Sequence, residues 1–318
     1  MSIPSSALNA TDLNAIAAVL KRAKHVAILT GAGVSAESGV PTFRDAQTGL
    51  WAKFRPEDLA TPDAFKRNPP MVWQWYQERR AAIAKVAPNP GHFALAKMQT
   101  RFEHFTLITQ NIDGLHLKAG STDVIELHGN ILKTRCFDCN APQEPGTRTR
   151  PGDSGSPPPC DCGKSFCRPD VVWFTEALPI AAIDRAQQAA RECDVFFSIG
   201  TSTQVFPAAD LPFEAKVRGA VVVEINPDDT PLTQHADYVL RAPSGVALPL
   251  LLENLNGNPA QDPCATSLSS ITPSKPAATN TSRVCCPSRG AARRTDSGVS
   301  LQVCGKPVST IAPSVGCS

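Results

Sequence analysis

The sequence lacks several features that are typical of membrane proteins, nucleic-acid-binding proteins and secreted proteins. Its 318 residues contain no run of about 18 apolar residues, which argues against a membrane-spanning helix. The net charge at pH 7 is only +2, so charge alone gives no argument for a nucleic-acid-binding protein. The first ten residues lack the basic head and apolar stretch of a secretory signal. A disulfide framework is therefore not expected, and the 11 cysteines are better explained as metal ligands or core residues.

The last 62 residues lack Phe, Trp and Tyr altogether. Residues 257–318 hold instead 11 Ser, 6 Thr and 7 Pro, with six basic and two acidic side chains. Such a composition buries too little apolar surface to offset the loss of chain entropy on folding. We therefore predict a disordered tail at 257–318 and a folded domain at 7–256. Five cysteines of the tail match no ligand spacing, and we expect unpaired thiols at Cys264, Cys285, Cys286, Cys304 and Cys317.

Short apolar, β-prone runs alternate with helical patterns in the folded part. The predicted strands are residues 25–30, 105–109, 123–127, 194–199, 221–225 and 237–240. The predicted helices include one capped near Thr11 and three others at 92–101, 181–192 and 207–217. This alternation predicts an α/β fold with a doubly wound, Rossmann-like parallel sheet. The region 131–170 breaks the pattern with many Pro and Gly and five Cys, and predicts a small insert that something other than a core holds together.

A strand, a glycine turn and a helix start follow one another at residues 26–36. Gly31, Gly33 and Ala36 match the spacing G-x-G-x-x-G/A, which allows a tight turn and the close approach of a pyrophosphate to a helix N-terminus. A dehydrogenase would show a second strand ending in an acidic residue about 20 positions later, but this window reads PTFRD at 41–45. The pattern predicts a nucleotide site and disfavours hydride transfer. A tight turn without a ligand is the alternative.

Polar side chains follow two further predicted strands. Gln110, Asn111 and Asp113 stand at a strand's carboxyl end, where open parallel sheets bind ligands. A polar turn that caps the next helix is the alternative. His128 also follows a strand, and its ordinary pKa of about 6.5 suits a general base, although a single histidine is more often structural. His116 is a competing candidate, and the family resemblance given below implies only a minor role for it.

The cysteines of the insert have the spacing of a metal site. Cys136 and Cys139 form a C-x2-C pair, and Cys160 and Cys162 form a C-x-C pair 20 residues later. Two thiolate pairs separated by about 15–20 residues are typical of a tetrahedral structural zinc site. The second pair is one residue shorter than usual, and Cys167 is an alternative fourth ligand. No His or carboxylate completes an open catalytic site, so the predicted metal is structural.

The segment GAGVSAESGVPTFR at 31–44 closely resembles the opening motif of the sirtuins, the NAD-dependent protein lysine deacylases. Further matches follow in the family's order: TQNIDGLH at 109–116, ELHG at 126–129, the cysteine insert, RPDVVWF at 168–174, GTS at 200–202, and Asn226. The resemblance covers roughly residues 10–254. It implies a sirtuin catalytic domain, with NAD as co-substrate and one structural zinc.

The resemblance also implies which residues form the site. His128 would take a proton from a ribose hydroxyl, and Asn111 and Asp113 would complete the catalytic set. Cys162 would be the fourth zinc ligand, because Cys162 and the glycine after it resemble the family's last cysteine knuckle. The residues expected to bind NAD are Gly31, Ala32, Gly33, Ser35, Ala36, Glu37, Pro41, Thr42, Phe43, Arg44, Trp51, Gln110, Asn111, Ile112, Asp113, Gly200, Thr201, Ser202, Asn226, Pro227, Asp228 and Ser244.

The run at 171–174 has two explanations. By itself it is a short core strand. By the resemblance its backbone pairs with an extended substrate peptide, and Val172 and Phe174 flank the stem of the acylated lysine. Thr175 stands where the family usually has glycine, and its β-branched side chain is conformationally stiffer.

Tyr76 and Arg79 form a Y-x-x-R pattern within a helical stretch at 73–80. Residues three apart share a helix face. The pattern resembles the signature of the sirtuin-5 class, which removes succinyl, malonyl and glutaryl groups. A guanidinium binds the carboxylate of such groups bidentately, a tyrosine adds a donor, and Ala60 leaves room for a longer chain. Arg80 points about 100° away from Arg79, so we prefer Arg79. A solvated helix surface is the alternative.

We therefore expect NAD-dependent removal of succinyl, malonyl and glutaryl groups from protein lysines, with weak deacetylation, giving nicotinamide and 2′-O-acyl-ADP-ribose. The alternatives are an ordinary deacetylase, a zinc-containing NAD(P) dehydrogenase, and a zinc-ribbon binding module with a vestigial nucleotide site. The expected partners are acylated lysine side chains of proteins, not nucleic acid or membranes, and a monomer is expected. The resemblance implies a mitochondrial location, with cytoplasm or nucleus as alternatives because no presequence is evident.

Overall fold

A computed structural model describes residues 8–40, 56–143 and 155–257. Its centre is a six-stranded, fully parallel sheet with the order β3-β2-β1-β7-β8-β9. The strands are β1 His25–Thr30, β2 His104–Thr109, β3 Ile125–Glu126, β7 Val195–Ile199, β8 Val221–Ile225 and β9 Tyr238–Leu240. All six lie where the sequence predicted strands. The order reverses between β1 and β7, and ligands bind at such a switch point in open α/β sheets.

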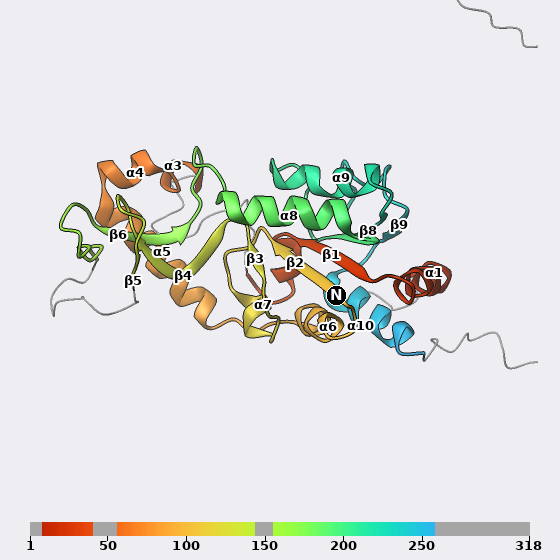
Figure 1. The fold of residues 1–318 in the computed structure, drawn as a ribbon. Helices are drawn as coiled ribbons and strands as arrows, with labels where there is room; N and C mark the ends of the chain where they lie inside the picture. Colours follow the sequence, from red (N-terminus) through yellow and green to blue (C-terminus); the bar gives the residue numbers. More distant parts are fainter. Residues whose placement is uncertain (1–7, 41–55, 144–154, 258–318) are drawn as a thin grey trace, which may run out of the picture. The chain divides into compact units, whose positions relative to one another are not determined.

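Helices cover both faces of this sheet (Figure 1). Alternate residues of a strand point to opposite faces. Val26 and Ile28 of β1 thus pack with α1 Ala10–Leu20, α6 Pro90–Gln99 and α10 Ser244–Leu255. Ala27 and Leu29 pack on the other face with α8 Ile180–Glu192 and α9 Leu211–Val217. The predicted doubly wound α/β fold is confirmed.

Helix starts were the least accurate part of the sequence prediction. The side chain of Asn9, not Thr11, caps α1 by accepting a bond from the Thr11 backbone N–H. Asn89 caps α6, which begins two residues before the predicted position. The helix predicted at 207–217 is a 3₁₀ turn, Ala208–Asp210, followed by α9. Short polar caps carry no hydrophobic periodicity, so a search for periodicity misses them.

A second, smaller unit contains an antiparallel sheet with the order β5-β4-β6. Its strands are β4 Gly129–Cys136, β5 Pro142–Gln143 and β6 Cys167–Val171. Three helices pack against β4 and β6 in one apolar cluster, and these are α3 Pro56–Leu59, α4 Pro62–Arg67 and α5 Pro69–Ala84. The insert predicted at 131–170 is therefore part of a unit that includes α3 to α5, which the sequence argument did not foresee.

None of the described helices is both long and apolar enough to cross a membrane. The last described helix, α10, ends at Leu255, one residue before the predicted domain end. The predicted tail lies outside the described residues, and its disorder stays a prediction.

Candidate active site

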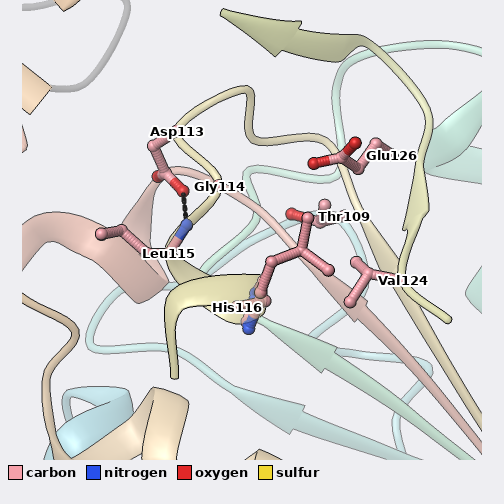
Figure 2. Close-up of a pocket in the computed structure, with 8 residues that line it drawn as sticks. Thr109, Asp113, Gly114, Leu115, His116, Val124 and Glu126 are labelled. Atoms are coloured by element: carbon pink, nitrogen blue, oxygen red, sulfur yellow. Dashed lines mark hydrogen bonds between the residues drawn. The ribbon is translucent and has the colours of Figure 1, made fainter. Parts of the chain in front are cut away.

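Three polar side chains meet where β1 and β2 end. Ser35 lies on α2 Gly33–Ala36, directly after β1, and its hydroxyl donates to the Asp113 carboxylate at 2.7 Å. The amide of Asn111 donates to Ser35 Oγ at 3.1 Å and to the Gly31 carbonyl at 3.0 Å. The other oxygen of Asp113 accepts from the Leu115 backbone N–H at 2.9 Å (Figure 2). The structure thus brings three predicted site residues into one network, and burial raises the pKa of the Asp113 carboxyl.

Two buried histidines support this network. The Asn89 backbone N–H donates to His92 Nδ1 at 3.3 Å, so Nε2 carries the proton of the neutral ring and faces Ser35 Oγ at 3.4 Å. His116 lies on α7 Leu115–Lys118, with its ring centre 4.8 Å from that of His92 and its Nε2 2.9 Å from Thr30 Oγ1. Burial lowers the pKa of His92 to about 4 and of His116 to about 3. His116 is therefore neutral and packed inside the protein.

His128 is held in the tautomer that a general base needs. Its Nδ1 lies 2.8 Å from the carbonyl oxygen of Gln110, which can only accept, so Nδ1 carries the proton and Nε2 keeps a free electron pair. Burial lowers the pKa of His128, and the bond to Gln110 opposes this shift. The next residue, Gly129, has φ +77°, and a Cβ there would lie 2.2 Å from the Asp170 carbonyl oxygen. Glycine at this position lets β4 approach β6.

The glycines of the first loop pack against the loop after β7. A Cβ on Gly31 would lie 2.9 Å from the Gly200 carbonyl oxygen, and one on Gly33 would lie 2.8 Å from the Gly200 Cα. The Gly33 N–H also donates to the Gly200 carbonyl at 2.8 Å. Gly200 has φ +59°, and its own Cβ would lie 2.5 Å from the Val34 nitrogen. The sequence argument assigned Gly31 and Gly33 to a tight turn and the approach of a pyrophosphate, and the structure shows that they also let the two loops at the switch point touch.

The third loop at this edge follows β8. The Asn226 amide donates to the Thr201 carbonyl at 2.9 Å, which ties this loop to the loop after β7. Arg241 donates to the carbonyl oxygens of Asn226 at 3.2 Å and Asp228 at 2.8 Å. Pro227 and Asp228 are exposed. The predicted residues of this loop thus lie beside Thr201, at the same edge of the sheet as Asn111.

Two residues predicted to bind the cofactor contact each other at the start of α10. The Glu37 carboxylate accepts from the Gly245 backbone N–H at 2.7 Å and lies 3.4 Å from the Ser244 hydroxyl. A carboxylate is stabilised at a helix N-terminus by the free N–H groups there. Both side chains therefore have a clear structural role. Of the remaining predicted residues, Ala32 precedes α2 and Ala36 is its last residue. Ile112 packs beside the smaller unit, and Ser202 follows Thr201.

The Tyr76 side chain is buried, not part of a solvated helix surface. It is 3% exposed, and its hydroxyl accepts from the Trp173 indole N–H at 2.9 Å. Burial raises the pKa of Tyr76 to about 12, although the nearby charge of Arg79 opposes this shift. The Arg79 guanidinium lies 5.0 Å from the centre of the Trp75 ring, and burial lowers its pKa. The predicted pair thus shares one face of α5, turned toward the protein.

Arg80 has a different role from Arg79. Its guanidinium donates to the carbonyl oxygens of Ile131 at 2.5 Å and Lys133 at 2.7 Å, and so holds β4 against α5. Ala60, the residue expected to leave room for a longer acyl chain, is buried, and its carbonyl accepts from the Phe174 N–H at 2.9 Å. These contacts give Arg80 a structural role and place Ala60 beside the predicted substrate run.

In the run at 171–174, only Val171 belongs to a strand, because β6 ends there. The Val172 N–H donates to the His128 carbonyl at 2.9 Å, and the Trp173 N–H donates to the Glu176 carboxylate at 2.8 Å. The explanation as a core strand therefore holds for Val171 alone. The Phe174 side chain is 46% exposed, and Val172 is half-buried. A peptide lying along this run has to pair through carbonyl groups, since the run's own N–H groups are engaged.

A buried arginine fixes the shape of this run. Arg168 is 2% exposed, and both ends of its guanidinium donate to Glu176, at 2.5 and 2.9 Å. Its guanidinium carbon lies 3.3 Å from the centre of the Trp173 ring. Thr175, in the turn between Trp173 and Glu176, has φ +73°. The turn therefore keeps a left-handed conformation, which glycine would adopt freely and threonine adopts only under strain.

The four preferred cysteines form one cluster. The sulfur atoms of Cys136, Cys139, Cys160 and Cys162 all lie within 4.8 Å of one another. Two of the S···S distances are 3.7 and 3.8 Å, and a tetrahedral zinc with Zn–S bonds of about 2.3 Å requires about 3.8 Å. The Cys162 N–H points at Cys160 Sγ at 3.5 Å. The geometry fits structural zinc held by these four thiolates.

Cys167 lies outside this cluster. It is buried and pairs with Cys136 across the β4–β6 ladder. The one-residue spacing of Cys160 and Cys162 is made possible by a tight turn. The Gly163 N–H bonds back to the Cys160 carbonyl at 3.1 Å, and Gly163 has φ +66°. A turn of this kind supplies two sulfur atoms from three residues.

A model of the Sir2 family matches residues 31–207. The chain belongs to the Sir2 family. An NAD-dependent protein deacylase of Ralstonia nicotianae is 52% identical over 233 residues, which are 73% of this chain and 93% of that protein. One of Aquifex aeolicus is 52% identical over 224 residues, 70% of this chain and 92% of that protein. The resemblance to sirtuins is confirmed.

Solved structures give the same family. A Sir2 homologue in complex with NAD has a TM-score of 0.71 and 43% identity, over 77% of this chain and 94% of that chain. A Sir2 protein with a p53 peptide and NAD+ has a TM-score of 0.67 and 29% identity, over 75% and 96% of the two chains.

Some predicted residues of this Sir2 domain cannot be placed, and some residues at the site were missed. Pro41, Thr42, Phe43, Arg44 and Trp51 lie outside the described residues. Arg168 and Trp173 stand in the motif RPDVVWF, but the motif did not indicate which groups they contact. Arg241 had no signal in the sequence, since its contacts are mainly to backbone carbonyls of another loop. His92 had one, because the pattern N-P-G at 89–91 is a typical helix start, where capping groups gather.

Proposed function

We propose that this protein removes acyl groups from lysine side chains of proteins in an NAD-dependent reaction, with nicotinamide and 2′-O-acyl-ADP-ribose as further products. The observation that carries the proposal is the network at the switch point, where Asn111, Ser35 and Asp113 lie at one edge of the sheet with His128. The names of the relatives support it, since they are NAD-dependent protein deacylases.

The residues at this edge fit NAD chemically. When bound, NAD supplies the ribose carbon that takes the acyl oxygen and the nicotinamide that leaves. The Asn111 amide and the Asp113 carboxylate are held by Ser35 and suit a ribose and an amide. His128 offers the unprotonated Nε2 to a ribose hydroxyl. The hydrogen bond from its Nδ1 to the Gln110 carbonyl fixes the orientation of the ring. The cysteine cluster lies in the smaller unit and serves the fold.

We infer further that the preferred acyl groups end in a carboxylate. Arg79 and Arg80 are adjacent on α5. The Arg80 guanidinium donates to backbone carbonyls of β4. Arg79 lies on the same face as the buried Tyr76 hydroxyl, beside the run that receives the substrate. A cation and a hydroxyl donor in a partly desolvated place suit the carboxylate of succinyl, malonyl or glutaryl lysine.

The test compares succinyl-, malonyl- and acetyl-lysine peptides with NAD, followed by mass spectrometry. We expect nicotinamide release with the acidic acyl groups and slower deacetylation. Arg79→Met should lower kcat/KM for desuccinylation about 30-fold or more, since a charge pair left half-made costs about 2–5 kcal/mol. The acetyl peptide is the matched control, and its turnover should change little. Tyr76→Phe should show the same preference more weakly.

Equal losses for both acyl groups would contradict the acyl preference and leave an ordinary deacetylase. A change in nicotinamide absorbance without release of nicotinamide would contradict the deacylase itself and indicate hydride transfer. The proposed partners are acylated protein lysines, and one structural relative is complexed with a p53 peptide. The monomeric state and the cellular location stay predictions.

A further inference from the structure

The acyl-binding helix and the substrate run are joined by one buried hydrogen bond. The Trp173 indole N–H donates to the Tyr76 hydroxyl oxygen at 2.9 Å, although the two residues are 97 positions apart. Both side chains are almost fully buried, at 2% and 3% exposure. Their rings lie 6.3 Å apart in the cluster that packs α5 against β4 and β6.

This bond decides the direction in which the Tyr76 hydroxyl donates. An indole nitrogen is a donor only, so the phenol oxygen has to accept, and its own proton has to point elsewhere. Within the described part of the chain, no group accepts that proton. A buried donor without an acceptor costs free energy until a ligand supplies one. The adjacent Arg79 makes an anionic acceptor the favourable one.

The indole is itself held rigidly. The Arg168 guanidinium stacks on the Trp173 ring at 3.3 Å and is fixed by two bonds to Glu176, which also accepts from the Trp173 backbone N–H. A cation over an indole face draws electron density from the ring and strengthens N–H donation. A phenol that accepts a strong bond becomes a stronger donor in turn. The chain of contacts runs from Arg168 through Trp173 to Tyr76.

We propose that Trp173 is a specificity-determining positioning residue, whose indole N–H directs the Tyr76 hydroxyl proton at the carboxylate of an acidic acyl group. This inference rests on the proposed function, and in particular on the acyl preference assigned to Tyr76 and Arg79. Trp173 lies between Val172 and Phe174. It therefore connects the run proposed to bind the peptide with the proposed acyl site.

The test removes the indole N–H and keeps the ring. Trp173 is replaced by β-(3-benzothienyl)alanine, in which sulfur stands for the N–H, in the full-length protein. We expect kcat/KM for the succinyl peptide to fall about 5- to 10-fold, as for the loss of one oriented hydrogen bond, and kcat/KM for the acetyl peptide to stay within about 2-fold. The same replacement at Trp73 of α5 is the matched control, and thermal unfolding confirms that each variant folds.

A double-mutant cycle with Tyr76→Phe separates positioning from packing. Without the hydroxyl the indole N–H has nothing to direct, so the benzothienyl replacement should have no further effect on the succinyl-to-acetyl ratio. An equal loss for both acyl groups, no loss, or a loss that persists in the Tyr76→Phe background would each overturn the inference. If Tyr76→Phe and Arg79→Met are selective while the Trp173 replacement is not, the acyl preference stands and this inference alone fails. If those two variants are unselective, both fail.

Discussion

His128 shows how one hydrogen bond sets the chemistry of a residue. The backbone carbonyl of Gln110 can only accept, so the position of the imidazole proton follows from the main chain, and Nε2 is left basic. Burial lowers the pKa of His128, so that the neutral form dominates near pH 7. The Val172 N–H bonds to the His128 carbonyl, which places the base next to the run proposed to receive the substrate.

The pH dependence of turnover should report this environment. The active form of His128 is neutral, so the rate falls as pH decreases through its pKa. Because that pKa is lowered, the acid limb of kcat/KM should have its midpoint below the ordinary histidine value of about 6.5. His128→Ala should abolish turnover and keep NAD binding, measured by calorimetry. A midpoint above 6.5, or near-normal turnover in the variant, would remove His128 from the role of base.

Thr175 is the residue under the clearest local strain. A β-branched side chain at φ +73° costs roughly 1–3 kcal/mol, and glycine adopts this conformation without that cost. Glycine has a larger conformational entropy in the unfolded chain, which offsets part of this gain. Thr175→Gly should therefore stabilise the protein by about 1 kcal/mol and raise Tm by about 2–4 °C. Thr175→Ala keeps a Cβ and should gain less. A lower Tm for Thr175→Gly would show that the threonine side chain makes contacts worth more than the strain.

At the scale of elements, the three-stranded sheet depends on its cysteines. The strand β5 has only two residues and β6 has five, so the ladders supply little stability by themselves. The cysteine cluster joins the end of β4 to the turn at Cys160–Gly163, which precedes β6. A metal held by these four thiolates would join the end of β4 to this turn through coordinate bonds.

Zinc content and stability should therefore be lost together. Cys162→Ser should lower bound zinc, measured by elemental analysis, well below one per chain and lower Tm, since structural zinc supplies folding energy. Cys167→Ser is the matched control, because Cys167 pairs with Cys136 in the ladder but lies outside the cluster. It should keep its zinc. Zinc loss in the Cys167 variant and not in the Cys162 variant would show that Cys167, not Cys162, is the fourth ligand.

At the scale of the whole molecule, two buried histidines make folding sensitive to acid. The pKa of His92 is about 4 and that of His116 about 3, against about 6.5 in an unfolded chain. Between these values the unfolded state binds more protons than the folded state, so the free energy of unfolding falls as pH falls below 6.5. At pH 5 the loss is up to about 2 kcal/mol for each histidine.

The variant His116→Gln tests this statement. Glutamine can keep a polar contact to Thr30 but does not titrate. The decrease in unfolding free energy between pH 7 and pH 5, measured with urea, should be smaller in the variant than in the wild type by up to about 2 kcal/mol. The wild-type protein measured side by side controls for all other titrating groups. The same decrease in both proteins would contradict the burial of a neutral His116.

The parallel sheet was predictable because its strands are short apolar runs, of which the central strands β1, β7 and β8 are almost fully buried. All six predicted runs became strands, and the predicted ends differ from the observed ends by at most two residues. The cysteine ligands were predictable for a similar reason, since close pairs such as Cys136 and Cys139 carry their spacing in the sequence. Local patterns of this kind need no knowledge of the fold.

Sequence alone indicated the α/β class, the family, the cysteines of a metal site, and the candidates Asn111, Asp113 and His128, because those signals are periodicities and motifs over a few neighbouring residues. Only the tertiary structure decided what each side chain contacts. It showed that Gly31 and Gly33 pack on Gly200, and that the Tyr76 hydroxyl accepts from an indole 97 residues away. Contacts of that kind depend on how distant segments meet, and a single sequence does not encode them in any local pattern.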